Sequence, residues 1–308
     1  MTNILSVDVE DWFHILDVPS APRIEEWDSL PSRVEVNFRT LLHLFGRHQV
    51  QATCFFLGWV AERFPHLVRE AAAYGHEIAS HGYSHRLAYE MSAAAFLQDI
   101  ERARKLLQDV SGQPVIGYRA PGFSATKSTP WFFEKIAEAG YRYDSSVFPG
   151  LSGHGGIAHS PCAPYVIHTA TAERLFEFPI SVVETPLRRL CFFGGGYLRL
   201  FPWSLTKSMV NRVSKQGRPV IFYIHPREID PGHPRLPMSP VRAFKSYVNL
   251  GTTYSKLAKI LDEFEVTTFQ DVLESSWPEF AFAIPKKRVA LAGLTDGAEK
   301  MAQDVWSA

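Results

Sequence analysis

Two histidines, His81 and His85, stand four residues apart in the run SHGYSH at 80–85. If the backbone is helical there, both imidazoles lie on one face and can bind one metal ion. Because this spacing alone is a weak motif, a pair of surface or core histidines is an open alternative. The preceding run, 76–80, indicates a buried strand, and α/β barrels place their chemistry at the carboxyl ends of such strands.

Other reactive side chains also follow predicted strands. Asp8, Glu10 and Asp11 stand at the end of the strand 4–9, Arg119 follows 115–118, Asp144 follows 141–143, and His225 follows 219–224. The carboxyl ends of barrel strands converge, so these coincidences favour a single site at the C-terminal mouth of a β/α barrel. Two histidines and one carboxylate leave metal positions for water and substrate, as catalytic sites do.

The elements that position these residues alternate along the chain. Apolar residues at helical spacing, with Pro and Gly at the expected ends, separate the strands. This rhythm predicts an α/β fold. The glycines at 194–196 lack the Lys-Ser/Thr of a phosphate loop and predict a bend or a close backbone approach. The predicted helices are 33–47, 65–74, 92–110, 129–139, 203–216, 241–249 and 253–264, and further strands are predicted at 52–58 and 175–180.

Composition narrows the function classes. The 308 residues are 46% hydrophobic, which is ample for a sizeable core, and Lys plus Arg equal Asp plus Glu at 32 each. Without a basic excess, neither nucleic acid nor an anionic membrane is an expected partner. Three cysteines that cannot all pair, no N-terminal leader pattern and no apolar run of membrane-spanning length predict a cytoplasmic protein with no transmembrane segment.

Taken together, the motifs resemble polysaccharide deacetylases of the NodB-homology group, carbohydrate esterase family 4. The resemblance runs from about residue 4 to 273 and rests on the HGYSH, RAP and IHP motifs at 81–85, 119–121 and 224–226. More narrowly, 8–13, 194–199 and 225–231 are similar to the subgroup found beside exosortase and exopolysaccharide gene clusters.

The resemblance implies a distorted (β/α) barrel of about seven strands over residues 1–280, with a family-specific part from about 148. Residues 281–308 would form a peripheral or disordered tail. The resemblance also implies one divalent metal ion, most often zinc. The implied reaction is hydrolysis of N-acetyl groups on an amino-sugar glycan or oligosaccharide in exopolysaccharide biosynthesis.

The family roles carry over onto matching positions. His81 and His85 match the metal-ligating histidines, and Asp8 matches the general base that acts on the attacking water. His225 matches the histidine that protonates the leaving amine, a step that an amide nitrogen requires because it is otherwise a poor leaving group.

The supporting positions are also implied by the resemblance. Arg119 would orient the base, Asp144 would tune the acid His225, and the N–H of Gly122, beside Pro121, would help to hold the oxyanion. A buried structural ion pair is the alternative for Arg119 and for Asp144. Trp12 is either a sugar platform or a core residue.

The carboxylate that ligates the metal is ambiguous. The family's first motif has two adjacent aspartates, whereas Val9 follows Asp8 here, and Glu10 and Asp11 come next. We favour Glu10 because it shares the strand face with Asp8, although Asp11 has the shorter side chain that the family normally employs.

Two other functions remain open. One is hydrolysis of a small cyclic amide or imide on the same barrel. The other is a catalytically inactive glycan-binding barrel, which would retain sugar without chemistry. We favour the deacetylase because Asp8, His81, His85 and His225 are all present.

Overall fold

The computed structural model describes residues 2–150, 153–170, 174–186 and 188–277, built around one nine-stranded sheet. The sheet order is β10-β1-β2-β3-β4-β5-β7-β6, and β11 pairs with β1. These strands are β1 (Asn3–Val9), β2 (Thr53–Phe56), β3 (Glu77–Ser80), β4 (Gly117–Tyr118), β5 (Tyr143–Asp144), β6 (Tyr165–His168), β7 (Arg174–Glu177), β10 (Ile221–Ile224) and β11 (Val266–Thr267). A separate hairpin joins β8 (Val183–Glu184) to β9 (Arg189–Leu190).

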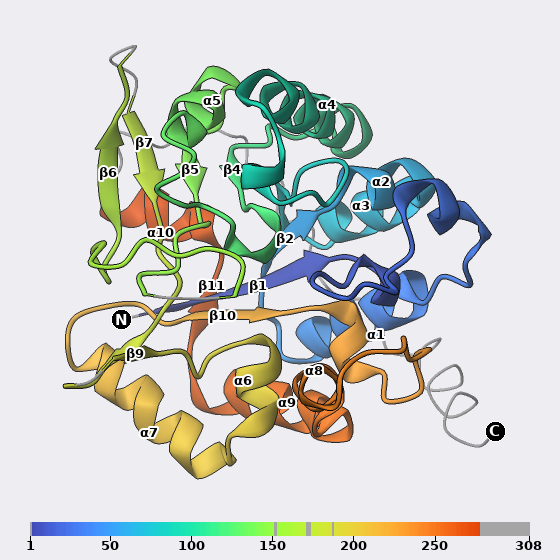
Figure 1. Ribbon diagram of the computed structural model, residues 1–308. Coiled ribbons are helices and arrows are strands. Elements are labelled where there is room, and N and C mark those ends of the chain that lie inside the picture. The colour runs from blue at the N-terminus through green and yellow to red at the C-terminus, as the bar shows by residue number, and fades with distance from the viewer. Residues whose placement is uncertain (1, 151–152, 171–173, 187, 278–308) are drawn as a thin grey trace.

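Seven strands, from β10 to β7 in the sheet order, run parallel, and β6 pairs antiparallel with β7. The sheet is strongly curved (Figure 1). Between its two sides, the Ser181 hydroxyl accepts a hydrogen bond from the N–H of Ile221, and Gly194 bridges to Tyr223. The predicted distorted α/β barrel of about seven strands is confirmed.

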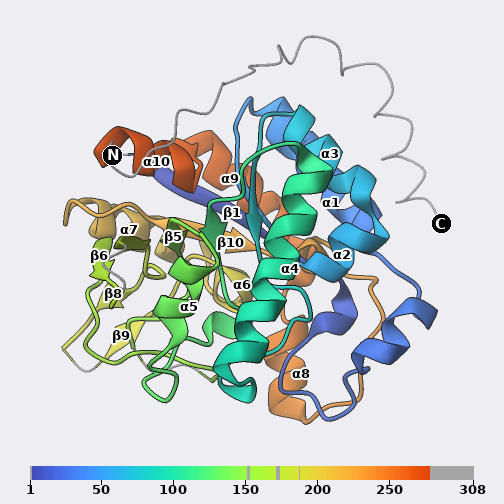
Figure 2. The same ribbon diagram turned by 90° about the horizontal axis from the view of Figure 1, so that it is seen from above.

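Helices surround the sheet. α4 and α5 lie on one side of β1 and β10, and α6, α7 and α9 lie on the other side (Figure 1). Seen from above, α10 lies near the N-terminus and α8 lies at the opposite end (Figure 2). The helices are α1 (Val34–Arg47), α2 (Gly58–Arg63), α3 (Pro65–Ala73), α4 (Ala93–Ser111), α5 (Phe132–Glu138), α6 (Gly195–Leu200), α7 (Trp203–Ser214), α8 (Pro240–Tyr247), α9 (Thr253–Glu263) and α10 (Phe269–Ser276).

The helix ends follow their sequence signals. The Ser92 hydroxyl accepts a hydrogen bond from the N–H of Ala95 and caps α4, and Gly112 ends α4 with a φ of 68°. The sequence predicted a strand over 52–58 and no helix there. The strand instead ends at Phe56, so α2 is an element that the sequence did not predict. Gly58 begins α2, where a Cβ atom would lie 2.6 Å from the ring of Tyr83.

The inner face of the curved sheet carries both apolar and polar side chains. The inner face holds an apolar cluster that includes Ile4 of β1, Phe55 of β2, Ala79 of β3 and Phe269 of α10. Because side chains alternate along a strand, Asp8 lies on the same face as Ile4, and His81 follows Ala79 on that face. The polar residues at the carboxyl ends of the strands therefore share the inner face.

Within the described residues, no helix has both the length and the apolar character needed to cross a membrane. The predicted tail 281–308 lies outside the described residues.

Candidate metal and catalytic site

The histidine motif follows β3 as an irregular loop, so the helical backbone considered as one possibility for 81–85 is not present. His85 has a φ of 55°, which a helix does not contain. The carboxylate of Asp99 on α4 accepts hydrogen bonds from the N–H groups of Tyr83 at 2.7 Å and Ser84 at 3.1 Å. These contacts hold the loop in its own conformation, and the two imidazoles still meet, with ring centroids 5.4 Å apart.

Glu10, His81 and His85 form a cluster of buried groups suited to a metal ion. One ligand atom from each lies within 4.8 Å of the others. The Nδ1–H of His81 donates a hydrogen bond to the carbonyl of Arg119 at 2.8 Å, since a carbonyl can only accept. His81 therefore presents the lone pair of Nε2, as a metal-ligating histidine does.

The contacts and the pKa of Glu10 indicate whether this cluster fits a cation. Its Oε2 lies 2.5 Å from Nε2 of His85, yet it accepts no hydrogen bond of good geometry from the described residues. Burial alone would raise the pKa of Glu10, but His85 and His225 hold it well below its usual value. A buried, ionised carboxylate oxygen beside two imidazoles fits a divalent ion, and this donor set suits zinc.

Asp11, the other candidate carboxylate, is engaged elsewhere. It caps the short 3₁₀ helix η1 (Trp12–His14) and ties it to the start of α1. Because these contacts occupy both oxygens, the structure brings Glu10 and not Asp11 to the histidines. Its donors are the N–H groups of Trp12, Arg33 and Val34 and the hydroxyl of Ser32.

Asp8 is held by Arg119, as the resemblance implied. Nη1 of Arg119 lies 2.7 Å from Oδ1 of Asp8 and donates a second hydrogen bond to the Ser6 hydroxyl at 2.8 Å. The guanidinium is fully buried, 4.1 Å from the ring centroid of Phe55. The pair is thus both a buried ion pair and a device that fixes the orientation of the Asp8 carboxylate.

His225 faces these carboxylates from β10. Its Nε2 lies 3.5 Å from Oε1 of Glu10 and 3.8 Å from Oδ2 of Asp8, and its Nδ1 lies 3.0 Å from Oε2 of Glu228. Burial alone would lower the pKa of His225, but Glu10 and Glu228 raise it above the usual value. The carboxylate that contacts His225 is therefore Glu228, which sequence reasoning missed, and not Asp144 as expected.

Asp144 supports a different part of the site. It accepts hydrogen bonds from the N–H and the hydroxyl of Ser146, and that hydroxyl accepts one from the N–H of Ala120. Burial raises the pKa of Asp144 to about 6, and burial and the Asp144 charge raise that of the neighbouring Glu177. Asp144 on β5 thus stabilises the loop after β4, and among the described residues it makes no hydrogen bond or ion pair with His225.

That loop carries Pro121 and Gly122 in the 3₁₀ helix η4 (Pro121–Phe123). Gly122 has a φ of 62°, and a Cβ there would lie 2.9 Å from Cδ1 of Leu16 and 3.0 Å from Cδ2 of Leu87. Both the conformation and the crowding require glycine.

Trp12 belongs to the core. Its side chain is 6% exposed, its Nε1–H donates to the carbonyl of Pro31, and its ring packs against Phe13. Of the two interpretations of Trp12, the structure supports packing over a sugar platform.

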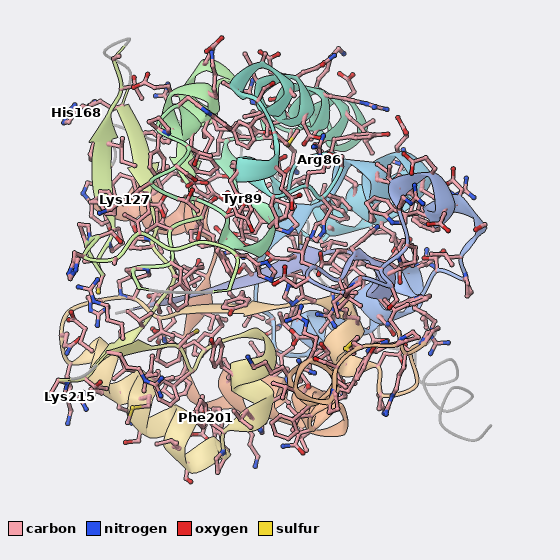
Figure 3. The ribbon with its side chains drawn as sticks, viewed as in Figure 1. Arg86, Tyr89, Lys127, His168, Phe201 and Lys215 are labelled. Atoms are coloured by element: carbon pink, nitrogen blue, oxygen red, sulfur yellow. The ribbon has the colours of Figure 1, made fainter. Side chains whose placement is uncertain are left out.

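Figure 3 labels two side chains just beyond the histidine loop, Arg86 and Tyr89, and the Tyr89 side chain is exposed.

Comparison with known proteins divides the chain into two matched regions. Residues 26–143 match the family described as polysaccharide deacetylase, and residues 145–274 match a domain of unknown function, DUF3473. His81, His85 and Arg119 lie in the first region and His225 lies in the second. The candidate site therefore draws on both regions and on Asp8 and Glu10, which precede them.

A curated relative is the peptidoglycan deacetylase of Helicobacter pylori, 29% identical over 150 residues, or 49% of this chain and 47% of that protein. The chain spans about half the length of the curated relatives it matches.

Solved structures show the same fold. A protein from Mycobacterium smegmatis described as a polysaccharide deacetylase has a TM-score of 0.58 at 19% identity, covering 94% of this chain and 96% of that one. The Puue allantoinase has a TM-score of 0.58 at 16% identity, covering 89% and 90%.

Proposed function

We propose that the protein is a metal-dependent N-deacetylase of amino-sugar glycans. The premise is that residues 26–143 of this chain belong to the polysaccharide deacetylase family. One observation carries the proposal. The ligand atoms of Glu10, His81 and His85 lie within 4.8 Å of one another, and Nε2 of His225 lies 3.5 Å from Glu10 and 3.8 Å from Asp8. The residues that we propose as ligands, base and acid thus follow strands at one end of the barrel.

Glu10, His81 and His85 would hold one divalent ion, with zinc as the first candidate because imidazole and carboxylate are its usual nitrogen and oxygen ligands. When bound, such an ion supplies Lewis-acid chemistry that polarises the acetyl carbonyl and favours ionisation of water.

The chain's own residues divide the proton transfers. Water attacks the acetyl carbon, and Asp8, oriented by Arg119 at 2.7 Å, accepts the proton that this water loses. Nε2 of His225 donates a proton to the amide nitrogen as the carbon–nitrogen bond breaks, which releases acetate and leaves a free amine. The N–H of Gly122 is the proposed donor to the carbonyl oxygen as it gains negative charge.

The substrate class is an N-acetylated amino-sugar glycan, supported by the family match and by relatives named as peptidoglycan deacetylases. A role in exopolysaccharide biosynthesis is supported by the resemblance of 8–13, 194–199 and 225–231 to the exosortase-associated subgroup. The cytoplasmic location stays a prediction.

The test combines metal content with acetate release from an N-acetylglucosamine oligomer. We expect about one zinc-class ion per wild-type chain, loss of the ion in His81→Ala, and retention of the ion with loss of acetate release in Asp8→Asn. His43→Ala, an exposed histidine on α1, is the matched control and should behave as wild type.

Absence of metal from the wild type, with acetate release unaffected by Asp8→Asn, would overturn the proposal. Metal without acetate release would favour a cyclic amide or imide as the substrate, which is tested by incubating the metal-loaded protein with such a compound and measuring ring opening.

A further inference from the structure

The matched region of unknown function contains a line of buried charged groups that ends at His225. Oε2 of Glu228 lies 3.0 Å from Nδ1 of His225, and Oε1 of Glu228 lies 3.1 Å from Nε of Arg199, an ion pair without a hydrogen bond of good geometry. Arg199 is 2% exposed and Glu228 is 1% exposed. Burying an ion pair costs free energy unless its groups make further polar contacts. The contacts of Arg199 and Glu228 with the surrounding residues therefore indicate what holds the pair in place.

Arg199 is fixed on its other side by backbone carbonyls. Its Nη1 donates to the carbonyl of Ser246 at 2.7 Å and its Nη2 donates to that of Lys245 at 3.1 Å, both near the end of α8. The guanidinium therefore spans from α8 to Glu228 and cannot turn without breaking these contacts.

The glycines at 194–196 allow this arrangement. A Cβ on Gly194 would lie 2.3 Å from the ring of Tyr223, and a Cβ on Gly196 would lie 3.2 Å from the carbonyl of Lys245. α6 can thus approach both β10 and α8, and it carries Arg199 in its last turn before Phe201, which is labelled in Figure 3. The close backbone approach predicted for 194–196 therefore positions Arg199.

Glu228 holds both the ring and the backbone of His225. The same Oε2 accepts a hydrogen bond from the backbone N–H of His225 at 3.0 Å. Burial alone would raise the pKa of Glu228, but Arg199 and His225 lower it to about 2. An ionised carboxylate only accepts, so Nδ1 of His225 must carry a proton, and Nε2 is left facing Asp8 and Glu10.

We propose that Glu228 is the positioning residue for His225 and that Arg199 positions Glu228, so that region 145–274 builds the proton-donating half of the site. This inference rests on the proposed function in one respect, namely that His225 donates the proton to the leaving amine. A carboxylate that fixes the orientation and protonation of a catalytic imidazole is an established arrangement in enzymes.

The first experiment separates positioning from folding. Glu228→Gln should lower kcat about 100-fold with KM unchanged, and it should lower stability because Arg199 is left as an unpaired buried cation. Glu228→Gln combined with Arg199→Gln removes both charges and should recover part of the stability while kcat stays low.

Asp230→Asn is the matched control on the same loop. Asp230 binds Arg33 and Asn37 and so anchors this loop to α1 without touching His225. We expect its kcat to stay close to wild type. If kcat recovers with stability in the double variant, or falls equally in Asp230→Asn, the role of Glu228 is structural and the inference is overturned.

A second measurement does not depend on activity. Nitrogen NMR of the His225 ring, assigned with a His225→Gln variant, should show a proton on Nδ1 when the ring is neutral. In Glu228→Gln the neutral ring should carry its proton on Nε2 instead.

An unchanged tautomer in Glu228→Gln would overturn the inference. If the wild type releases no acetate but the tautomer changes as expected, the positioning role stands and the proposed function fails, so the two outcomes are distinguishable.

Discussion

The inner face of the barrel carries buried carboxylates at both ends, and they differ in their partners. At the N-terminal end, Glu77 is the first residue of β3, and all of its hydrogen-bond donors are neutral. Burial raises the pKa of Glu77 to about 7, and its hydrogen bonds only partly offset this effect. The donors are the hydroxyls of Thr53 and Tyr143, at 2.5 and 2.7 Å, and the N–H of Gln270, at 3.1 Å.

At the C-terminal end the carboxylates are as deeply buried but face a guanidinium and imidazoles. Asp8 meets the Arg119 guanidinium, and Glu10 meets the imidazoles of His85 and His225, which hold the Glu10 pKa well below its usual value. The same burial therefore gives opposite shifts for Glu77 and Glu10. Basic partners, and not depth alone, decide which end keeps an anion that can bind a metal.

Removing the cation at the C-terminal end should have the largest effect. In Arg119→Met, Asp8 is left as a buried anion that has lost its guanidinium partner, so the free energy of unfolding should fall by about 3–5 kcal/mol in urea denaturation. Arg104→Met is the control, because this half-buried arginine donates to a carbonyl, that of Val115, and should cost about 1 kcal/mol. Equal losses in the two variants would contradict the comparison.

At the N-terminal end, Glu77 should make the free energy of unfolding depend on pH. Glu77 has a pKa near 4.5 when unfolded and about 7 when folded, so the folded state binds the proton more tightly. Stability from Glu77 is thus fully present below pH 4.5 and is lost as pH rises through 7, by about 3 kcal/mol in total. Glu77→Gln lacks this loss, so its stability relative to wild type should rise by that amount across this range. A constant difference between the two proteins would refute the assignment.

The C-terminal end also depends on the loop that carries the histidines. Asp99→Ala removes the acceptor for the N–H groups of Tyr83 and Ser84, so metal affinity should fall about 10- to 100-fold in a chelator competition titration. Asp109→Ala is the matched control, since Asp109 is exposed on the same helix and pairs only with exposed Lys105 among the described residues. Unaltered affinity in Asp99→Ala would show that the loop holds its shape without this carboxylate.

The smallest effect is expected for Tyr143→Phe. This change removes a neutral hydroxyl that donates to Oε1 of Glu77 at 2.7 Å, and it should cost about 1 kcal/mol of unfolding free energy while kcat stays unchanged. A large loss of activity would mean that the N-terminal end of the barrel contributes to catalysis, contrary to the comparison.

Much of the fold could be predicted from periodicity and end signals. The strand Asn3–Val9 and the helix Ala93–Ser111 with its Ser92 cap follow from local patterns that the tertiary structure preserves. The spacing of His81 and His85 suggested that the two rings meet if the backbone is helical, and they meet without a helix. Their loop conformation depends on Asp99, which contacts it from α4, and no local pattern reveals that contact.

The identities of the supporting carboxylates were harder to predict. Glu10 and Asp11 are adjacent, and the choice between them depends on the turn at η1, where Asp11 is used as a cap. Glu228 stands three residues after His225, a capping-box spacing that could have suggested the contact. Arg199 could not be paired with Glu228 from sequence, because Glu228 follows β10 and only the close approach of Gly194, at the start of α6, to β10 brings them together.

The most direct test of the account compares metal content in two neighbouring variants. Glu10→Gln removes the carboxylate that lies beside the histidines, whereas Asp11→Asn alters the carboxylate that caps η1. After dialysis against zinc and removal of the excess, the account predicts that Glu10→Gln loses the ion and that Asp11→Asn keeps about one ion per chain. Loss of the ion in Asp11→Asn with retention in Glu10→Gln would contradict it.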